Sequence, residues 1–223
     1  MVAPYNKLYD EPAYGMSEAA VYLRVPYNTL RYWLTGFKKM PPIVSPAETA
    51  PVRLSFFNLL ECHMLAGMRK LYDLQLPKVR RALREIGERD RKPHPLVTQA
   101  FFTDRKDLFI ERLDEIINVS QYGQMGLKFY HMHLERVEVD LNGTFRFFPF
   151  VSQPGPLEPR FIEINPMIGF GKPVIAGTGI STAIIASRFS ARESIADLSA
   201  EYGCSSQQIE EAIRWERALP IAA

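Results

Sequence analysis

The sequence predicts an α+β protein: a helical N-terminal domain with a helix-turn-helix, a small β-rich middle domain, and a C-terminal three-helix domain that is also helix-turn-helix-like. Three observations support this prediction. Apolar residues recur at helical spacing in the first and last thirds of the chain. They alternate in the middle third, and prolines interrupt the patterns near residues 91–96 and 151–160. The predicted domains are therefore 1–92, 93–160 and 161–223.

Composition sets broad limits. The chain has 223 residues, of which 47% are hydrophobic and 23% are charged, as in ordinary globular proteins. No apolar run approaches the roughly eighteen residues that a membrane helix needs. The first residues also lack the basic and apolar regions of a signal peptide. Cys62 and Cys204 are too few for a disulfide framework and too far apart for a zinc-binding pair. We therefore expect a cytoplasmic protein.

Basic residues are concentrated in the first predicted domain. Residues 1–92 hold fifteen Lys and Arg against nine Asp and Glu, a net charge of +6. Residues 93–160 hold seven Lys and Arg against nine Asp and Glu, and residues 161–223 hold five against seven. Each of these two domains therefore has a net charge of −2. A basic domain on a nearly neutral chain favours an anionic partner, of which nucleic acid is the commonest. A solvated basic surface without a partner is the alternative explanation.

The first predicted domain begins with two short helices. Ser17 is the expected cap of the first helix. Pro26 fits the first turn of the second helix because its fixed φ suits that position. The apolar positions that these helices would bury are Ala20, Val21, Leu30, Trp33 and Leu34. Two short helices joined by a tight turn form a helix-turn-helix, whose second helix can lie in the major groove of DNA.

The stretch that follows is rich in proline, and Ser55 is then the expected cap of a long helix. Another amphipathic helix is predicted over residues 74–89. This order of parts, with RVPYNTLRYWL and then RLSFFNLLECHMLAGMRKLYDLQLPKVRRAL, resembles the DNA-binding domain of MerR-type regulators over about residues 13–87. The chain departs from that family in the wing, where a longer proline-rich link replaces a short glycine-containing hairpin. Arg53 stands at the position of the family's wing arginine.

Several residue types near the second helix are suited to DNA. Asn can read adenine through two hydrogen bonds, Arg can read guanine or hold phosphate, and hydroxyl groups can contact phosphates. Asn28 and Thr29 could instead merely cap the helix, and Trp33 is expected in the core. The predicted DNA contacts are Tyr27, Asn28, Thr29, Arg31, Tyr32, Lys38, Lys39 and Arg53.

The middle domain is predicted to hold about four strands, and it resembles no family that we recognise. Two strands are expected over residues 96–113, and two more on either side of Asn142-Gly143, a pair that favours a two-residue hairpin turn. Val137, Val139 and Leu141 show the alternation. His131 and His133 would share a strand face with Glu135, a spacing that permits a metal. Two ordinary strand histidines are the alternative, and the one we favour.

The stretch GKPVIAGTGIST, residues 171–182, has three glycines, a lysine and two threonines. It matches neither the phosphate-binding loop nor the dinucleotide-binding glycine pattern. The sequence instead predicts a short strand over residues 173–175 and a helix beginning near Ser181. Gly177 and Gly179 are expected to adopt positive φ in the turn between them.

A second helix-turn-helix is predicted over residues 194–215. Ser199, Gly203, Cys204 and Ile209 repeat the spacing of Ala20, Arg24, Val25 and Leu30. Gly203 suits a left-handed turn residue because it has no Cβ. The second helix of this pair is acidic, so a protein partner is favoured there over DNA.

The third domain resembles, over about residues 161–216, the short domain of unknown function carried by VapB-type antitoxins. The matching motifs are Asn165-Pro166, GKPVI, GTGI and Ala212-Ile213, and Gly179 stands where that family usually has arginine. The resemblance implies a PIN-like ribonuclease toxin as partner, whose metal site an antitoxin would block. The toxin-contact candidates are Lys172, Thr178, Arg188, Glu210 and Arg214.

Three functions remain open at this point. The first is an antitoxin that binds a palindromic operator as a homodimer, represses its own operon and neutralises a toxin. The second is a stand-alone MerR-like regulator whose middle domain senses a ligand. The third is a metalloenzyme that uses His131 and His133. We find no recognisable catalytic constellation, and we expect no enzyme activity, cofactor or resident metal.

Overall fold

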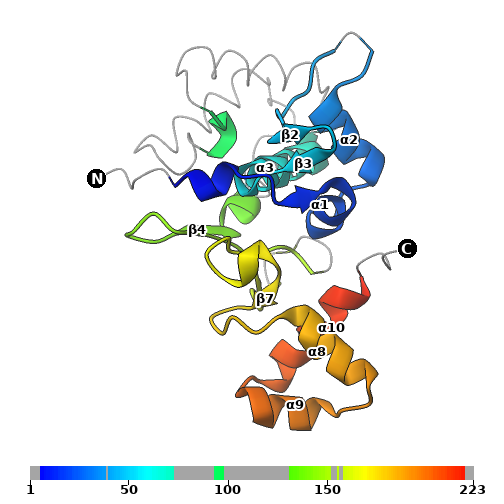
Figure 1. Cartoon of the computed structure of the whole chain (residues 1–223), viewed down its shortest axis with the longest axis vertical. Coiled ribbons are helices and arrows are strands. Elements are labelled where there is room, and N and C mark those ends of the chain that lie inside the picture. The colour runs from blue at the N-terminus through cyan, green and yellow to red at the C-terminus, as the bar shows by residue number, and fades with distance from the viewer. Residues whose placement is uncertain are drawn as a thin grey trace. The chain divides into compact units, whose positions relative to one another are not determined.

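The computed structural model describes residues 6–38, 40–72, 93–97, 131–151, 155 and 158–218. The chain divides into two compact units, residues 1–143 and 144–223. Helices and small antiparallel sheets together give the predicted α+β fold (Figure 1). The division between the units falls inside the predicted middle domain.

The described part of unit 1 consists of helices and short strands. A 3-10 helix, η1 (Lys7–Asp10), precedes β1 (Tyr14–Gly15), α1 (Met16–Tyr22) and α2 (Tyr27–Thr35). Then come β2 (Glu48–Thr49), β3 (Val52–Leu54), α3 (Phe56–Tyr72) and, beyond residues outside the described set, β4 (Val137–Val139). The sheet has the order β1-β3-β2 and is antiparallel, with Tyr14 opposite Leu54 and Glu48 opposite Arg53.

Helix caps explain where two of these helices begin. The cap of α1 is Gly15, which makes no side-chain cap bond, so the prediction of Ser17 as the cap is wrong. The helix begins at Met16, one residue before Ser17, and follows directly after strand β1. The prediction for α3 is confirmed. Ser55 Oγ accepts from the Asn58 backbone N–H, and Asn58 Oδ1 accepts from the Ser55 backbone N–H, both at 3.1 Å.

The core of unit 1 is built around α3. Tyr9, from η1, packs between Phe56 and Phe57, with ring centroids 5.6 and 5.1 Å away. All three are buried, as are Leu59 and Leu60 further along α3. Each fully buried large apolar side chain contributes roughly 1.5–3 kcal/mol, so this contact holds the N-terminal segment against α3.

The middle segment differs from its prediction. Residues 131–134 are helical rather than extended, so His131, His133 and Glu135 do not share a strand face. Residues 95–97 are also helical, while the rest of the predicted strand pair at 98–113 and the helix predicted over 74–89 lie outside the described residues.

The strands on both sides of Asn142-Gly143 are confirmed as β4 and β5 (Phe145–Phe147). The turn is longer than predicted: Gly143 N–H donates to Asp140 O at 3.0 Å, and Gly143 has a φ of 78°. Asn142-Gly143 therefore occupies the last two positions of the turn, and Leu141 lies exposed within it rather than in a strand.

The described part of unit 2 combines short strands with three α-helices. Strands β5, β6 (Ile162–Glu163) and β7 (Val174–Ile175) precede α8 (Thr182–Ser190), α9 (Ile195–Tyr202) and α10 (Ser206–Arg217). β6 pairs with β7 in antiparallel register, and Phe147 exchanges two backbone hydrogen bonds with Ile164. The predicted strand, the helix that begins after Ser181, and the positive φ of Gly177 and Gly179 are all confirmed.

The helices of unit 2 enclose their own core. Leu198 of α9, Ile209 and Trp215 of α10 and Ile185 of α8 are completely or almost completely buried. Thr182, at the start of α8, hydrogen-bonds the carboxylate of Glu216 in α10. In the described part of the chain, no helix is both long and apolar enough to cross a membrane.

Candidate nucleic-acid and protein interfaces

The turn between α1 and α2 has one left-handed residue, Arg24, with a φ of 53°. The next backbone N–H, that of Val25, donates to Ala20 O at 3.0 Å and so closes the turn over the end of α1. Pro26 then precedes α2, and its carbonyl accepts from the N–H groups of Thr29 and Leu30. These backbone bonds hold α2 at a defined angle to α1, as the predicted helix-turn-helix requires.

One face of α2 is buried and the other is open. Leu30, Trp33 and Leu34 are buried against unit 1, which confirms that Trp33 belongs to the core. The helix has no side-chain cap, so neither Asn28 nor Thr29 serves as its cap residue. The predicted contact residues of α2 lie on the side away from the core: Tyr27, Asn28 and Arg31 are exposed, and Thr29 and Tyr32 are half-buried.

The chain turns tightly directly after α2. Gly36 has a φ of 73°, and a Cβ there would clash with the Met40 carbonyl oxygen, so glycine is required. Phe37 and Met40 exchange two backbone hydrogen bonds, and the ammonium of Lys38 lies 5.4 Å from the centroid of the Phe37 ring. Phe37 and Met40 are exposed beside the predicted contact Lys38. Sequence reasoning missed these two, although an aromatic after a glycine was a usable signal. Lys39 lies outside the described residues.

The proline-rich link does form a hairpin, through β2 and β3. Arg53 lies in the central strand, β3, and its guanidinium donates to the Ala13 carbonyl at 3.2 Å. Arg53 therefore helps to hold the segment before β1 onto the sheet and is less available to a partner than Arg31. Among the described residues, none forms an ion pair with Arg31 or Lys38.

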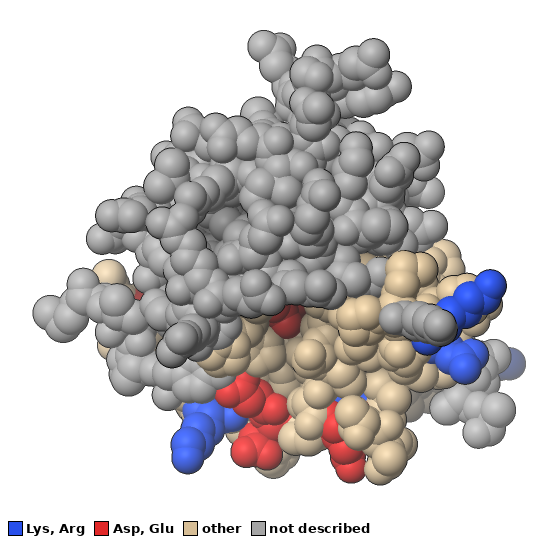
Figure 2. Space-filling model, turned by 90° about the horizontal axis from the view of Figure 1, so that it is seen from above, with Lys and Arg blue, Asp and Glu red and all other residues tan. Residues whose placement is uncertain are grey.

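Charge is unevenly distributed over the described surface. In the view of Figure 2, a group of Lys and Arg side chains lies at the right-hand edge, and no acidic side chain is seen next to it. Acidic side chains are seen in the lower part of the view, where a Lys or Arg side chain also lies beside them. Cations that lie together at a surface favour an anionic partner.

The second helix-turn-helix has the same turn geometry. Gly203 is left-handed, with a φ of 63°, and the N–H of Cys204 donates to Ser199 O at 3.2 Å. Ser205 and Gln208 form a capping box at the start of α10, which fixes where that helix begins. The left-handed position predicted for Gly203 is confirmed.

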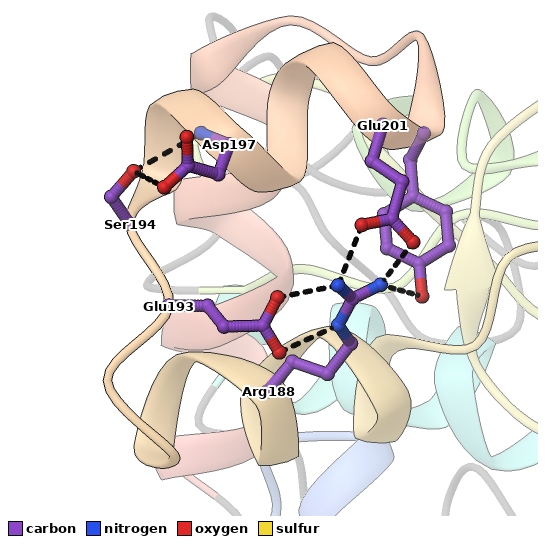
Figure 3. A network of polar contacts seen from close by, with 6 residues as sticks. Arg188, Glu193, Ser194, Asp197 and Glu201 are labelled. Carbon is purple, nitrogen blue, oxygen red and sulfur yellow. Dashed lines mark hydrogen bonds and ion pairs between the residues drawn. The ribbon is translucent and has the colours of Figure 1, made fainter.

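Arg188 of α8 is held inside unit 2 by two carboxylates. Its Nε donates to Glu193 at 2.8 Å, one terminal nitrogen donates to Glu201 at 2.6 Å, and the other donates to the Tyr202 hydroxyl at 2.9 Å (Figure 3). These hydrogen bonds raise the pKa of the Arg188 guanidinium above its usual range, and the bond to Glu201 has the largest effect. The same bond lowers the pKa of the Glu201 carboxylate. Arg188 thus joins α8 to α9 and to the link between them.

The other candidate toxin contacts fall into two groups. Arg214 pairs with the buried Glu211 on α10, and the Thr178 hydroxyl donates to Ile175 O at 2.8 Å, so both make contacts within unit 2. Lys172 and Glu210 are exposed. The structure therefore does not bring the five predicted residues together as one free surface.

A buried carboxylate explains the glycine-rich stretch. Glu163 of β6 accepts from the Gly177 backbone N–H at 3.3 Å and from the Asn165 side chain at 3.2 Å. Ile180 N–H in turn donates to the Thr178 hydroxyl at 3.1 Å. These contacts account for the turn before α8 as a structural element. Sequence reasoning missed Glu163, whose only signal was a carboxylate between two apolar strand residues.

Histidines occupy two places in unit 1, one half-buried and one buried. His94 lies between two carboxylates, with Nε2 2.9 Å from Asp10 and Nδ1 2.9 Å from Glu61. Burial lowers its pKa, but the bond to Glu61 and the charges of both carboxylates outweigh this, so the pKa is raised. His94 ties η1 and α3 to the segment around residue 94.

The buried place holds His63 and His133. His63 Nε2 lies 3.0 Å from the His133 carbonyl, and the ring centroids are 4.7 Å apart. Burial and the neighbouring His133 keep the pKa of His63 well below its usual value. His131 is exposed, away from this pair. No group of three or more His, Cys, Asp or Glu suited to a metal occurs within the described ranges.

Comparisons with known proteins agree with this architecture. A family model described as a protein of unknown function (DUF433) matches residues 162–215, the segment for which the sequence predicts a short domain of unknown function. Two Mycobacterium tuberculosis proteins, each 24% identical, are similar over most of their lengths. The uncharacterized protein Rv2308 aligns with 97% of this chain and over 95% of its own length. A protein named "Putative antitoxin VapB45" aligns with 92% of this chain and over 94% of its own length.

A solved structure supports the fold of the whole chain. The X-ray structure of Rv2018 from Mycobacterium tuberculosis matches with a TM-score of 0.68 at 23% identity, covering 92% of this chain and 99% of that one. The arrangement of helices and small sheets described above therefore occurs in an experimentally determined protein of similar length, and residues 162–215 carry the sequence pattern of the matching family.

Proposed function

We propose that this chain is an antitoxin that neutralises a PIN-like ribonuclease toxin by direct binding and represses its own operon. The observation that carries the proposal is the similarity to a relative named as an antitoxin, which extends over more than nine-tenths of both chains. Because the alignment includes both compact units, the proposal applies to the whole chain and not to one domain.

Unit 1 supplies the DNA-binding part of the proposal. The open face of α2 presents Tyr27, Asn28 and Arg31, and the turn after the helix adds Lys38. A helix of this kind enters the major groove with its first residues toward the base edges, while flanking cations contact phosphates. Unit 1 would use Asn28 and Arg31 for base contacts and Lys38 for the backbone. A homodimer would place two such helices on a palindromic operator.

Unit 2 supplies the protein-binding part. Glu210 is exposed on α10, the helix that corresponds to the DNA-reading helix of a helix-turn-helix. A carboxylate there is repelled by a phosphate backbone, and the arginines Arg188 and Arg214 are engaged with carboxylates of the same unit. These features favour a protein partner over a second DNA site.

Co-expression with the product of the adjacent reading frame tests the toxin part. We expect a complex that survives purification, and ribonuclease activity from the partner only after the two are separated. If the two proteins do not associate while the chain still binds its own upstream DNA, the function is instead that of a stand-alone regulator.

Binding to the upstream DNA tests the repressor part. We expect the affinity to fall steeply as salt is raised, because each phosphate contact releases counterions. Binding that does not depend on salt would contradict a site built from Arg31 and Lys38.

A further inference from the structure

The loop between β6 and β7 presents a fully exposed aromatic side chain. Phe170, in the short 3-10 helix η2 (Gly169–Gly171), is 97% exposed, and Met167 in the same loop is 56% exposed. Burial of a phenylalanine side chain is favourable, so this ring would gain from contact with an apolar partner surface.

The backbone at Phe170 is unusual for this residue type. Three consecutive residues are left-handed: Gly169 with a φ of 58°, Phe170 with 54° and Gly171 with 74°. The glycines adopt this region without cost, but a bulky side chain rarely does. Backbone strain of this kind persists where the surrounding structure imposes it, commonly at functional sites.

The loop imposes this conformation through its own hydrogen bonds. Asn165 accepts from Met167 N–H through its side chain and from Ile168 N–H through its carbonyl, at 3.0 and 2.9 Å. Gly171 N–H then donates to Ile168 O, and Lys172 N–H donates to Gly169 O. Gly171 is buried while its neighbour Phe170 is exposed, so the bonded turns direct the ring outward.

We infer that Phe170, with Met167 of the same loop, is the apolar anchor by which this chain binds its toxin. The inference rests on the proposed function and names the part of unit 2 that makes the contact. A few aromatic anchors contribute most of the binding energy at protein interfaces, and they enter apolar pockets of the partner. The loop lies within residues 162–215, the part of the chain that matches the family model.

The chemistry of the loop favours a protein pocket as the occupant. Its described ionisable residues are the exposed Lys172 and, on the preceding strand, the buried Glu163. One cation is too little to hold a phosphate backbone or an anionic membrane surface. A single cation beside an aromatic instead suits an apolar pocket with an acidic rim, as a nuclease that holds its metal through carboxylates would offer. Arg188 and Arg214 are already paired within unit 2, so apolar contact is left as the main source of binding energy.

The experiment measures binding of the purified full-length chain to the product of the adjacent reading frame, together with thermal unfolding. Phe170→Gly removes the ring and also the backbone strain. We expect it to weaken binding at least about thirtyfold while leaving the melting temperature equal or higher. Phe170→Trp keeps an aromatic anchor and should retain most of the binding. Leu141→Ala is the matched control, because Leu141 is also a fully exposed apolar residue in a turn.

The outcomes separate this inference from the proposed function. If the wild-type chain does not bind the neighbouring product, the antitoxin function and the anchor both fail. If the wild-type chain binds and Phe170→Gly binds equally well, only the anchor fails. A change in the oligomeric state of Phe170→Gly with unchanged toxin binding would assign the loop to a second copy of this chain and would also overturn the inference.

Discussion

The turns of the two helix-turn-helix elements place a left-handed residue at the same point, although one is Arg24 and the other Gly203. In both turns, the N–H after that residue bonds back to the carbonyl five residues earlier, Ala20 in one and Ser199 in the other. Two sequences with few identical residues therefore form the same backbone element, because its requirements are local and concern size and backbone freedom rather than side-chain chemistry.

The second helices of the two elements differ on their open faces. When Arg24 is aligned with Gly203, the buried positions of α2 coincide with buried positions of α10, as at Leu30 and Ile209. The exposed positions also coincide, but Arg31 in α2 corresponds to Glu210 in α10. The same fold element is therefore kept while the charge at an exposed position is reversed.

Removal of a buried tryptophan tests whether the two elements fold as separate cores. Trp33 and Trp215 are both completely buried. We expect Trp33→Ala to lower the free energy of unfolding of unit 1 by about 3–5 kcal/mol. Trp215→Ala should lower that of unit 2 by the same amount. Hydrogen exchange read by mass spectrometry should show lost protection in α1 and α2 for the first variant and in α9 and α10 for the second. Equal loss in both units from either variant would show that the cores are not separate.

Charge exchange at the aligned position tests the difference between the surfaces. We expect Arg31→Glu to weaken binding to the upstream DNA about a hundredfold, since a contact worth about 1–3 kcal/mol is lost and repulsion is added. Glu210→Arg is the matched control and should change the affinity little. Fluorescence anisotropy with a labelled fragment measures both. Equal effects of the two substitutions would mean that α2 is not the DNA-binding helix.

The turn residues should respond in opposite directions to small substitutions. Gly203→Ala forces a Cβ into a left-handed position, at a cost of about 1–2 kcal/mol, although no atom lies near enough to clash. Arg24→Gly relieves the same strain in the other turn and should stabilise unit 1, or leave its stability nearly unchanged once the flexibility of the unfolded chain is included. Chemical denaturation measures both changes. Destabilisation by Arg24→Gly comparable to that of Gly203→Ala would assign Arg24 a side-chain role in the fold.

The smallest expected effect is a difference in pH dependence between the units. All four histidines of the chain, His63, His94, His131 and His133, precede residue 144 and thus lie in unit 1. The raised pKa of His94 stabilises unit 1 below about pH 6.5, and this contribution is lost as the pH rises through the folded-state pKa. The lowered pKa of His63 acts oppositely, because stability falls as the pH drops below about 6.5.

We therefore expect the stability of unit 1 to pass through a maximum near neutral pH, while unit 2 shows no histidine-dependent change. The measurement is denaturation followed separately for the two units between pH 5 and 9. His94→Asn is the useful variant, because asparagine tolerates the left-handed backbone at this position. His94→Asn should abolish the loss of stability above neutral pH and should leave the loss below neutral pH unchanged. An unchanged alkaline limb would show that the contacts with Asp10 and Glu61 do not hold a proton in the folded state.

Much of the fold could be predicted because its determinants lie within a few residues. The cap of α3, the left-handed Gly203, and the short strand before α8 follow from turn chemistry and apolar spacing. The middle segment was predicted less well. Residues 131–134 carry alternating polar and apolar residues, yet they are helical, because burial of His133 against His63 and Gly67 outweighs the local pattern.

The sequence by itself determined the positions of both helix-turn-helix elements, the left-handed turn at Gly203 and the charge contrast between the two second helices. Only the tertiary structure decided which charged and aromatic side chains remain open to a partner. Arg188 and Glu201 are 13 positions apart in the sequence, and His94 and Glu61 are 33 positions apart. The periodicity of apolar residues within a helix or strand gives no information about contacts at such separations. The outward direction of Phe170 likewise depends on the bonded turns that join β6 to β7. Local rules set backbone conformation, whereas exposure depends on which distant segments pack together.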